Sequence, residues 1–168
     1  MRCGSLRHKK GVVVSGFGGK RTYTTWDGLP VSEEPPHGCS IVVFRRIGDE
    51  LQLLMLHRHH NGADYEGDWA WTTPAGSRLP GEPVDDCARR ELFEETGLAL
   101  TLHTTSCGSP DWRIYWAEAP DDATIIADLE HDRYEWLPPS EALRRCLPER
   151  VRDDLTRVAE LIRQSAGG

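Results

Sequence analysis

Short apolar runs, separated by polar, glycine-rich or proline-rich stretches, recur along most of the chain. Residues 39–46 and 51–57 are two such runs joined by a short polar turn, which predicts an antiparallel pair of β-strands. Further segments with strand character lie at residues 69–73, 98–103, 112–119 and 134–137. The polar or proline-containing stretches that predict loops are residues 59–68, 74–83 and 121–132.

Helical periodicity marks three other segments, at residues 84–96, 139–146 and 149–164. The first follows Pro83, a residue suited to a helix start, and ends before Gly97, which suits a helix exit. Ala88 and Leu92, four residues apart, give this helix a buried stripe. The mixture of strands and helices predicts an α/β (α+β) fold, a sandwich built around a central mixed β-sheet.

The N-terminal region has a different character from the rest. Residues 1–11 are predicted to be unstructured, and a glycine cluster at 16–19 with β-type residues on either side predicts a hairpin. Prolines then mark a linker, so the chain divides into an N-terminal extension, 1–38, and a domain, 39–165. Because an isolated hairpin is marginal in water, it must pair with the sheet edge, pack on a face or cross to a second subunit in a homodimer.

Length and composition narrow the class of protein. The 168 residues suffice for one domain, and 38% hydrophobic with 28% charged residues is a globular composition. No apolar run is long enough to cross a bilayer, and no signal peptide opens the chain, so no membrane partner is expected. The five cysteines are scattered without C-x-x-C spacing, which argues against a disulfide framework and favours a cytoplasmic location.

The net charge of −7 is unevenly distributed. Residues 1–21 contain six basic and no acidic residues, so the rest of the chain is more acidic than the total suggests. An acidic body argues against a nucleic-acid duplex as the main partner. Acidic groups that lie near an anionic substrate need metal cations between them.

Acidic side chains are concentrated on the helix predicted at residues 84–96. Glu91, Glu94 and Glu95 have i, i+3 and i+4 spacing, so like charges adjoin, and two of them lie in the last turn, where the helix dipole disfavours anions. Local rules fail most often at functional sites. Clustered carboxylates without nearby thiols or helical histidines suit a hard cation, Mg²⁺ or Mn²⁺. On these glutamates alone, a solvated acidic face is an equal alternative.

The loop before this helix extends the pattern. The full sequence is Gly76-x5-Glu82-x7-Arg90-Glu91-Leu92-x-Glu94-Glu95-x-Gly97-Leu98. This segment resembles the Nudix box at all nine specified positions. The resemblance implies a Nudix-type α/β/α sandwich and a MutT-like hydrolase. It also implies a divalent metal and a nucleotide-type small molecule, a nucleoside diphosphate linked to another moiety, as the substrate.

The resemblance also implies roles for single residues. Glu91, Glu94 and Glu95 match the metal-binding glutamates of the family, and one of Glu94 and Glu95 orients or deprotonates the attacking water. Arg90 and Glu82 match positions that pair to brace the loop against the helix, which would hold the glutamates in place. The backbone positions that permit the tight turn and the helix exit are Gly76 and Gly97.

Substrate contacts are predicted more weakly. Tyr115 lies 17 residues after Leu98, near the distance of a tyrosine in dinucleoside polyphosphate hydrolases of this family. Trp71 offers a ring on which a base could stack, and Arg58 is a further candidate contact. We therefore expect dinucleoside polyphosphates or nucleoside triphosphates first, and ADP-ribose or nucleotide sugars second. The alternative is a Nudix domain that binds a nucleotide as a sensor without turnover.

Overall fold

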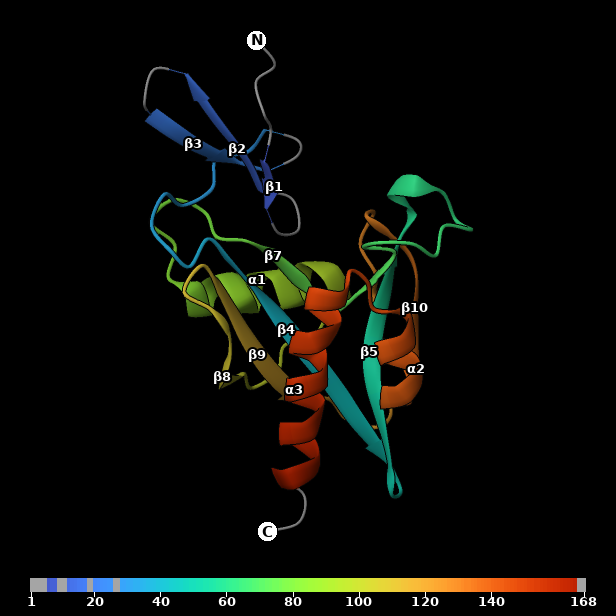
Figure 1. Cartoon of the computed structure of the whole chain (residues 1–168). Coiled ribbons are helices and arrows are strands. Elements are labelled where there is room, and N and C mark those ends of the chain that lie inside the picture. Colours follow the sequence, from blue (N-terminus) through green and yellow to red (C-terminus); the bar gives the residue numbers. More distant parts are fainter. Residues whose placement is uncertain (1–5, 9–11, 18–19, 26–27, 166–168) are drawn as a thin grey trace.

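A mixed β-sheet forms the centre of the molecule in the computed structural model, which describes residues 6–8, 12–17, 20–25 and 28–165 (Figure 1). Five strands follow one another across this sheet: β10 (His131–Leu137), β5 (Glu50–Arg58), β4 (Gly38–Ile47), β9 (Trp112–Glu118) and β8 (His103–Ser109). Two short strands complete it, β6 (Trp71–Thr72) beside β5 and β7 (Ala75–Ser77) beside β4. Only β4 and β9 run parallel among these pairs, so the predicted mixed sheet is confirmed.

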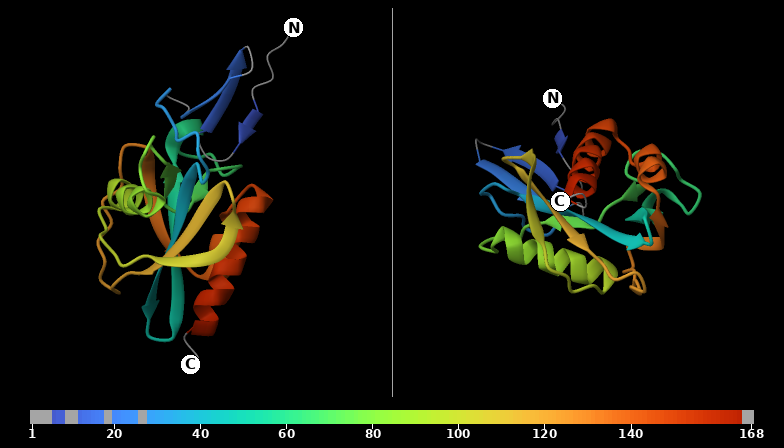
Figure 2. Two further views of the ribbon diagram at one scale, coloured as in Figure 1. Left: turned by 90° about the vertical axis from the view of Figure 1, so that its left-hand side faces the viewer. Right: turned by 90° about the horizontal axis from the view of Figure 1, so that it is seen from below.

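Helices cover both faces of the sheet (Figure 2). Helix α1 (Val84–Thr96) packs on one face, and α2 (Pro139–Arg145) and α3 (Glu149–Ser165) pack on the other. Alternation along β4 explains this arrangement, because Ile41 and Val43 join the core under α1, whereas Val42 and Phe44 join the core under α3. The predicted α/β/α sandwich is therefore confirmed. No helix in the described ranges is long and apolar enough to cross a membrane.

Several predicted elements differ from the structure; β10, for example, begins at His131, within the loop predicted at 121–132. Residues 98–103 were expected to form a strand, but β8 begins only at His103, because Leu100 and Leu102 pack against the core under α1 from a loop. The segment 74–83, expected to be a loop throughout, contains β7. That strand is held by backbone pairing with β4 and carries no apolar alternation from which it could be predicted.

The N-terminal region forms a small sheet of its own. Strands β2 (Val12–Phe17) and β3 (Lys20–Thr24) pair antiparallel in the segment where the sequence predicts a hairpin. A short strand, β1 (Leu6–His8), adds to β2, so residues 6–8 are structured, contrary to expectation, while the rest of 1–11 lies outside the described residues. The hairpin thus pairs with a third strand instead of the main sheet, and Figure 1 shows it beyond the end at which β4 begins.

Candidate active site

Arg90 of α1 is the centre of a charged cluster at the junction of β7 and the helix. Its Nε and Nη2 atoms donate to the two carboxylate oxygens of Glu82 at 2.8 and 3.0 Å. Nη2 also donates to the carbonyl oxygen of Ser77 at 3.1 Å, and the Leu79 N–H donates to Glu82 at 2.9 Å. Arg90 therefore ties α1 to the preceding loop through Glu82 and to the end of β7 through Ser77, while the Leu79 bond holds Glu82 within the loop.

The ionisation of this pair follows from the same contacts. Burial raises the pKa of Glu82, but hydrogen bonds from Arg90 and from the Leu79 N–H outweigh it and hold the pKa below its ordinary value. The hydrogen bonds to Glu82 in turn raise the pKa of Arg90. Both groups are charged at neutral pH, so the brace is a salt bridge.

The three glutamates of α1 lie in different environments. Arg90 Nη1 donates to Glu91 at 2.7 Å and to Glu94 at 3.1 Å, so one guanidinium offsets the repulsion expected between these two carboxylates. Glu94 remains the exposed member, with 55% of its side chain accessible. Glu95 is only 4% exposed and accepts a hydrogen bond from the Ala75 N–H at 2.9 Å, which joins α1 to β7.

Gly76 and Gly97 shape the backbone on either side of the glutamates of α1. A Cβ on Gly76 would overlap the carboxyl group of Glu91, so only a glycine lets β7 approach the helix this closely. Gly97 has a φ of 72° and donates its N–H to the Phe93 carbonyl at 2.8 Å, which ends α1 in a left-handed cap. The helix exit at Gly97 agrees with the expected role, whereas Gly76, expected to permit a tight turn, lies in β7 and permits a close approach instead.

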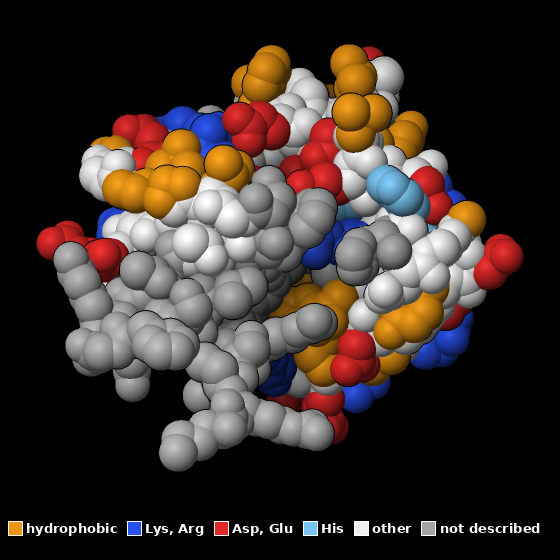
Figure 3. Space-filling model, turned by 90° about the horizontal axis from the view of Figure 1, so that it is seen from above, with side chains coloured by type: hydrophobic (Ala, Val, Ile, Leu, Met, Phe, Trp, Pro, Cys, Tyr) orange, Lys and Arg blue, Asp and Glu red, His pale blue; other side chains and the backbone are white. Residues whose placement is uncertain are grey.

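A cavity of about 290 Å³ lies on the α3 side of the sheet, next to this cluster. Ala75 lines it, and the Ala75 N–H donates to Glu95, so β7 lies between the cavity and this one carboxylate of the cluster. The view onto this end of the molecule shows hydrophobic side chains between acidic and basic ones (Figure 3). Side chains of α3 with helical i, i+3, i+4, i+7 spacing contribute the charges: Arg150, Asp153, Asp154 and Arg157. This spacing was visible in the sequence but did not by itself indicate a pocket.

The structure does not bring the predicted substrate contacts together. Trp71 is 0% exposed and donates its Nε1–H to Glu66 at 2.5 Å, so its ring has no free face for a base. Tyr115 is 2% exposed, lies in the core under α1 and donates its hydroxyl to Asp85. These two predictions took buried aromatic residues for ligand contacts, because sequence spacing does not report burial.

Arg58 occupies a third location. It lies at the end of β5, where its Nη2 donates to Glu130 at 2.7 Å. It does not line the cavity beside β7. Trp69 and Thr72 do line that cavity, and sequence reasoning had not selected them.

The sequence pattern of the NUDIX domain matches residues 36–159. The chain belongs to the Nudix family. This match covers both faces of the sandwich and includes all residues of the box. The predicted resemblance is confirmed, and with it the membership of a hydrolase family.

Relatives of this Nudix domain have several described activities. It is 31% identical over 123 residues to a bis(5′-nucleosyl)-tetraphosphatase (asymmetrical) of Rattus norvegicus, a match that covers 62% of this chain and 80% of that protein. It is 29% identical over 148 residues to an octanoyltransferase of Myxococcus xanthus and 27% identical over 153 residues to the 8-oxo-dGDP phosphatase NUDT18 of Homo sapiens. The chain spans 40% and 45% of these last two proteins.

Solved structures share the fold. An Ap4A hydrolase of C. elegans in a binary complex superposes with a TM-score of 0.61 at 19% identity, over 76% of this chain and 97% of that one. The dihydroneopterin triphosphate pyrophosphohydrolase of E. coli gives a TM-score of 0.58 at 19% identity, over 75% of this chain and 96% of that one. These similarities establish the Nudix sandwich.

Nudix hydrolases generally use divalent metals, and the residues on α1 fit such an ion. The donors are carboxylate oxygens, which hard cations prefer, and the space left by the missing Cβ of Gly76 is where Glu91 lies. Within the described residues no three His, Cys, Asp or Glu side chains already converge as a metal cage.

Proposed function

We propose that this Nudix domain is a divalent-metal-dependent pyrophosphohydrolase that cleaves a nucleoside diphosphate linked to another moiety. One observation carries the proposal: Glu91, Glu94 and Glu95 are presented on a single helix that a salt bridge braces against its loop. The cavity across β7 supplies a place for the rest of a substrate whose phosphates reach these carboxylates.

The chain's own residues divide the work of the reaction. Glu91, Glu94 and Glu95 would hold Mg²⁺ or Mn²⁺, which neutralises phosphate charge and lowers the pKa of water. One of Glu94 and Glu95 orients or deprotonates the attacking water, and Glu94 is the more accessible of the two. Arg90 acts as a positioning residue, because its bonds to Glu82 and Ser77 fix the helix against β7.

Dinucleoside polyphosphates or nucleoside triphosphates are the substrates we favour. Support comes from the rat tetraphosphatase and from the shared fold of the C. elegans Ap4A hydrolase. ADP-ribose and nucleotide sugars come second. The cavity of about 290 Å³ is large enough for a nucleoside moiety, but it does not determine which group is linked to the diphosphate of that nucleoside.

A substrate panel tests this function. Purified protein is incubated with Ap4A, nucleoside triphosphates, ADP-ribose and nucleotide sugars in the presence of Mg²⁺ or Mn²⁺, and released phosphate and nucleotide are measured. We expect turnover of at least one substrate that stops when EDTA is added. Absence of turnover across the panel would overturn the proposal, and nucleotide binding under the same conditions would then favour a sensor.

A further inference from the structure

Trp69 has a backbone conformation that tryptophan does not favour. Its φ is 68°, and it is the one non-glycine residue in the described part of the chain with a positive φ. The Ala70 N–H donates to the Gly67 carbonyl at 3.1 Å, so Trp69 is the third residue of a β-turn. That position takes glycine or asparagine when φ is positive. A bulky residue there is a true outlier, and such outliers occur most often at functional sites.

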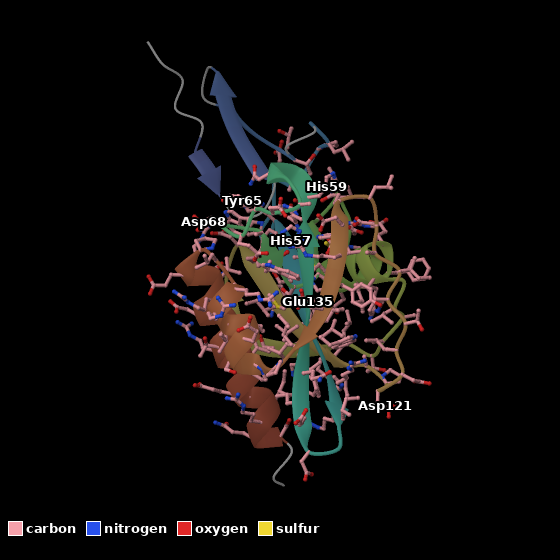
Figure 4. The ribbon with its side chains drawn as sticks, turned by 90° about the vertical axis from the view of Figure 1, so that its right-hand side faces the viewer. His57, His59, Tyr65, Asp68, Asp121 and Glu135 are labelled. Carbon is pink, nitrogen blue, oxygen red and sulfur yellow. The ribbon has the colours of Figure 1, made fainter. Side chains whose placement is uncertain are left out.

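The surrounding structure imposes this conformation. The Trp69 N–H donates to the Leu147 carbonyl at 2.9 Å, and the Arg58 N–H donates to the Ala70 carbonyl at 2.9 Å. Earlier in the same loop, His57 Nε2 donates to the Tyr65 carbonyl at 2.8 Å. In Figure 4, His57, Tyr65 and Asp68 lie toward the same end of the main sheet. A glycine would satisfy the same turn with less strain, so the ring itself must account for a tryptophan at this position.

The ring of Trp69 is in the right place to contact a ligand. It is half-buried and lines the cavity beside β7, and the Arg150 guanidinium lies 5.4 Å from its ring centroid. Trp112 also lines the cavity but is only 6% exposed and bonds Ser40 through Nε1 at 2.7 Å. Among the tryptophans that the structure describes, Trp69 alone is both partly exposed and part of the cavity wall.

Two polar groups in the same wall, on Thr72 and Asp154, lack partners within the part of the chain that the structure describes. The Oγ1 atom of Thr72 is buried without a hydrogen bond to any described group, and buried polar atoms rarely stay unpaired. Asp154 is half-buried and forms no ion pair or side-chain hydrogen bond with another described residue. A ligand with a flat aromatic face and hydrogen-bonding groups on its edge would stack on Trp69 and provide partners for Thr72 and Asp154.

We propose that Trp69 is a specificity-determining residue that stacks on the base of the nucleotide substrate in this cavity. The inference rests on the proposed function, because it assumes that a nucleotide is the substrate. Stacking of a base on an aromatic side chain is tolerant of base identity, so Trp69 would select for the presence of a base more than for its kind. The phosphates would then extend across β7 toward the glutamates.

Binding of AMP and of ribose 5-phosphate to the full chain tests this role without requiring turnover. Trp69→Gly removes the ring and relieves the positive φ, so we expect an unchanged or higher melting temperature. AMP should bind about tenfold more weakly or worse, while ribose 5-phosphate, which lacks a base, binds as in the wild type. Trp136→Leu is the matched control, because Trp136 is also half-buried beneath an arginine but lies outside the cavity. It should leave AMP binding unchanged.

Three results would overturn the inference: no AMP binding by the wild type, unchanged AMP affinity in Trp69→Gly, or equal weakening of AMP and ribose 5-phosphate. Should Trp69→Gly fail to fold, Trp69→Asn and Trp69→Phe replace it. Asparagine tolerates the turn without the ring and should lose AMP, and phenylalanine should restore binding. If the wild type hydrolyses no substrate but binds AMP in a Trp69-dependent way, the proposed function is refuted and this inference stands. If the wild type hydrolyses a nucleotide and Trp69→Gly does so equally well, the proposed function stands and this inference is refuted.

Discussion

A single guanidinium group connects most of the charged side chains of the candidate active site. Arg90 bonds both oxygens of Glu82 and also reaches Glu91, Glu94 and the backbone of Ser77. Helix periodicity predicts that the glutamates adjoin, but it does not predict that an arginine lies between two of them. That contact depends on how the preceding loop returns to the helix, which is a tertiary feature.

Replacement of Arg90 should reduce both stability and activity. Arg90→Ala leaves Glu82 with only the Leu79 N–H and the Ser77 carbonyl without its Arg90 donor in a part-buried site. We expect this to lower the free energy of unfolding by about 1–3 kcal/mol. Arg89→Ala is the control, because the Arg89–Asp86 pair on the same helix is more than half exposed and such pairs contribute little. Urea denaturation and kcat measure the two effects, and equal stability of both variants would refute the bracing role.

Replacement of Glu94 or Glu95 by the neutral glutamine should lower activity without altering the fold. Glu95→Gln retains an oxygen that accepts from the Ala75 N–H, and Glu94 is exposed, so neither change should alter the fold. We expect each to lower kcat by about 10²-fold or more, because transition-state charge loses a compensating ligand. Glu160→Gln, at an exposed position of α3, is the control. Near-normal turnover in both Glu94→Gln and Glu95→Gln would remove them from the catalytic assignment.

At the scale of elements, the two glycines that flank the box residues of α1 should give opposite phenotypes. Gly97→Ala places a Cβ in a left-handed cap, which we expect to lower stability by about 1–2 kcal/mol with little effect on kcat. Gly76→Ala forces the Glu91 carboxyl to move, which should reduce kcat more than stability. Thermal melting and steady-state kinetics of both variants check this, and the idea fails if the two variants behave alike.

The β5–β10 edge carries two histidine–aspartate pairs in which the histidine is buried and the aspartate is partly exposed. His57 Nδ1 lies 2.6 Å from Asp132, and His131 Nδ1 lies 2.6 Å from Asp128. Burial raises the pKa of each aspartate, but the histidine hydrogen bond and the favourable charges and hydrogen bonds around it together outweigh burial, so both pKa values lie below the ordinary range. A lowered carboxyl pKa stabilises the fold fully above the unfolded value near about 4, and this contribution disappears as pH falls toward the folded value.

Acid denaturation should therefore depend on these aspartates. Between about pH 5 and pH 2, the wild type should lose more of its unfolding free energy than the double variant Asp128→Asn/Asp132→Asn, which has no carboxyl to protonate there. Urea midpoints measured across this range check the slopes. Asp122→Asn, in an exposed loop, should keep the wild-type slope, and a double variant with that same slope would contradict the prediction.

Local signals account for the elements that the sequence predicted well. Helix α1 has its predicted bounds because Pro83 and Gly97 define its ends within the chain itself. Strand β7 and the turn at Trp69 were missed, since backbone pairing with β4 and hydrogen bonds from distant loops determine them. The box residues were found because their spacing is a one-dimensional pattern. The cavity wall is assembled from several elements and has no such pattern.

At the scale of the whole molecule, the segment before β4 belongs with the sandwich. Val31 is 2% exposed and packs into the core under α3, although the predicted domain began at residue 39. The Ser32 N–H donates to the Arg78 carbonyl at 2.8 Å, and the Arg78 N–H donates to the His37 carbonyl at 2.9 Å. Arg78 directly follows β7, so residues 31–37 support the loop that leads to the candidate site. The domain boundary at residue 38 stays a prediction that truncation can test.

Two truncations should therefore differ sharply. Removal of residues 1–28 leaves Val31 and the Arg78 contacts in place, and we expect the melting temperature to change little. Removal of residues 1–37 exposes the core beneath Val31 and breaks those backbone bonds, which should cost about 2–4 kcal/mol and lower the melting temperature by roughly 5 °C or more. Calorimetry measures both, and sedimentation of the shorter deletion shows whether the small N-terminal sheet joins two subunits. Equal destabilisation by the two deletions would place the support within residues 1–28 and refute the role of the segment 31–37.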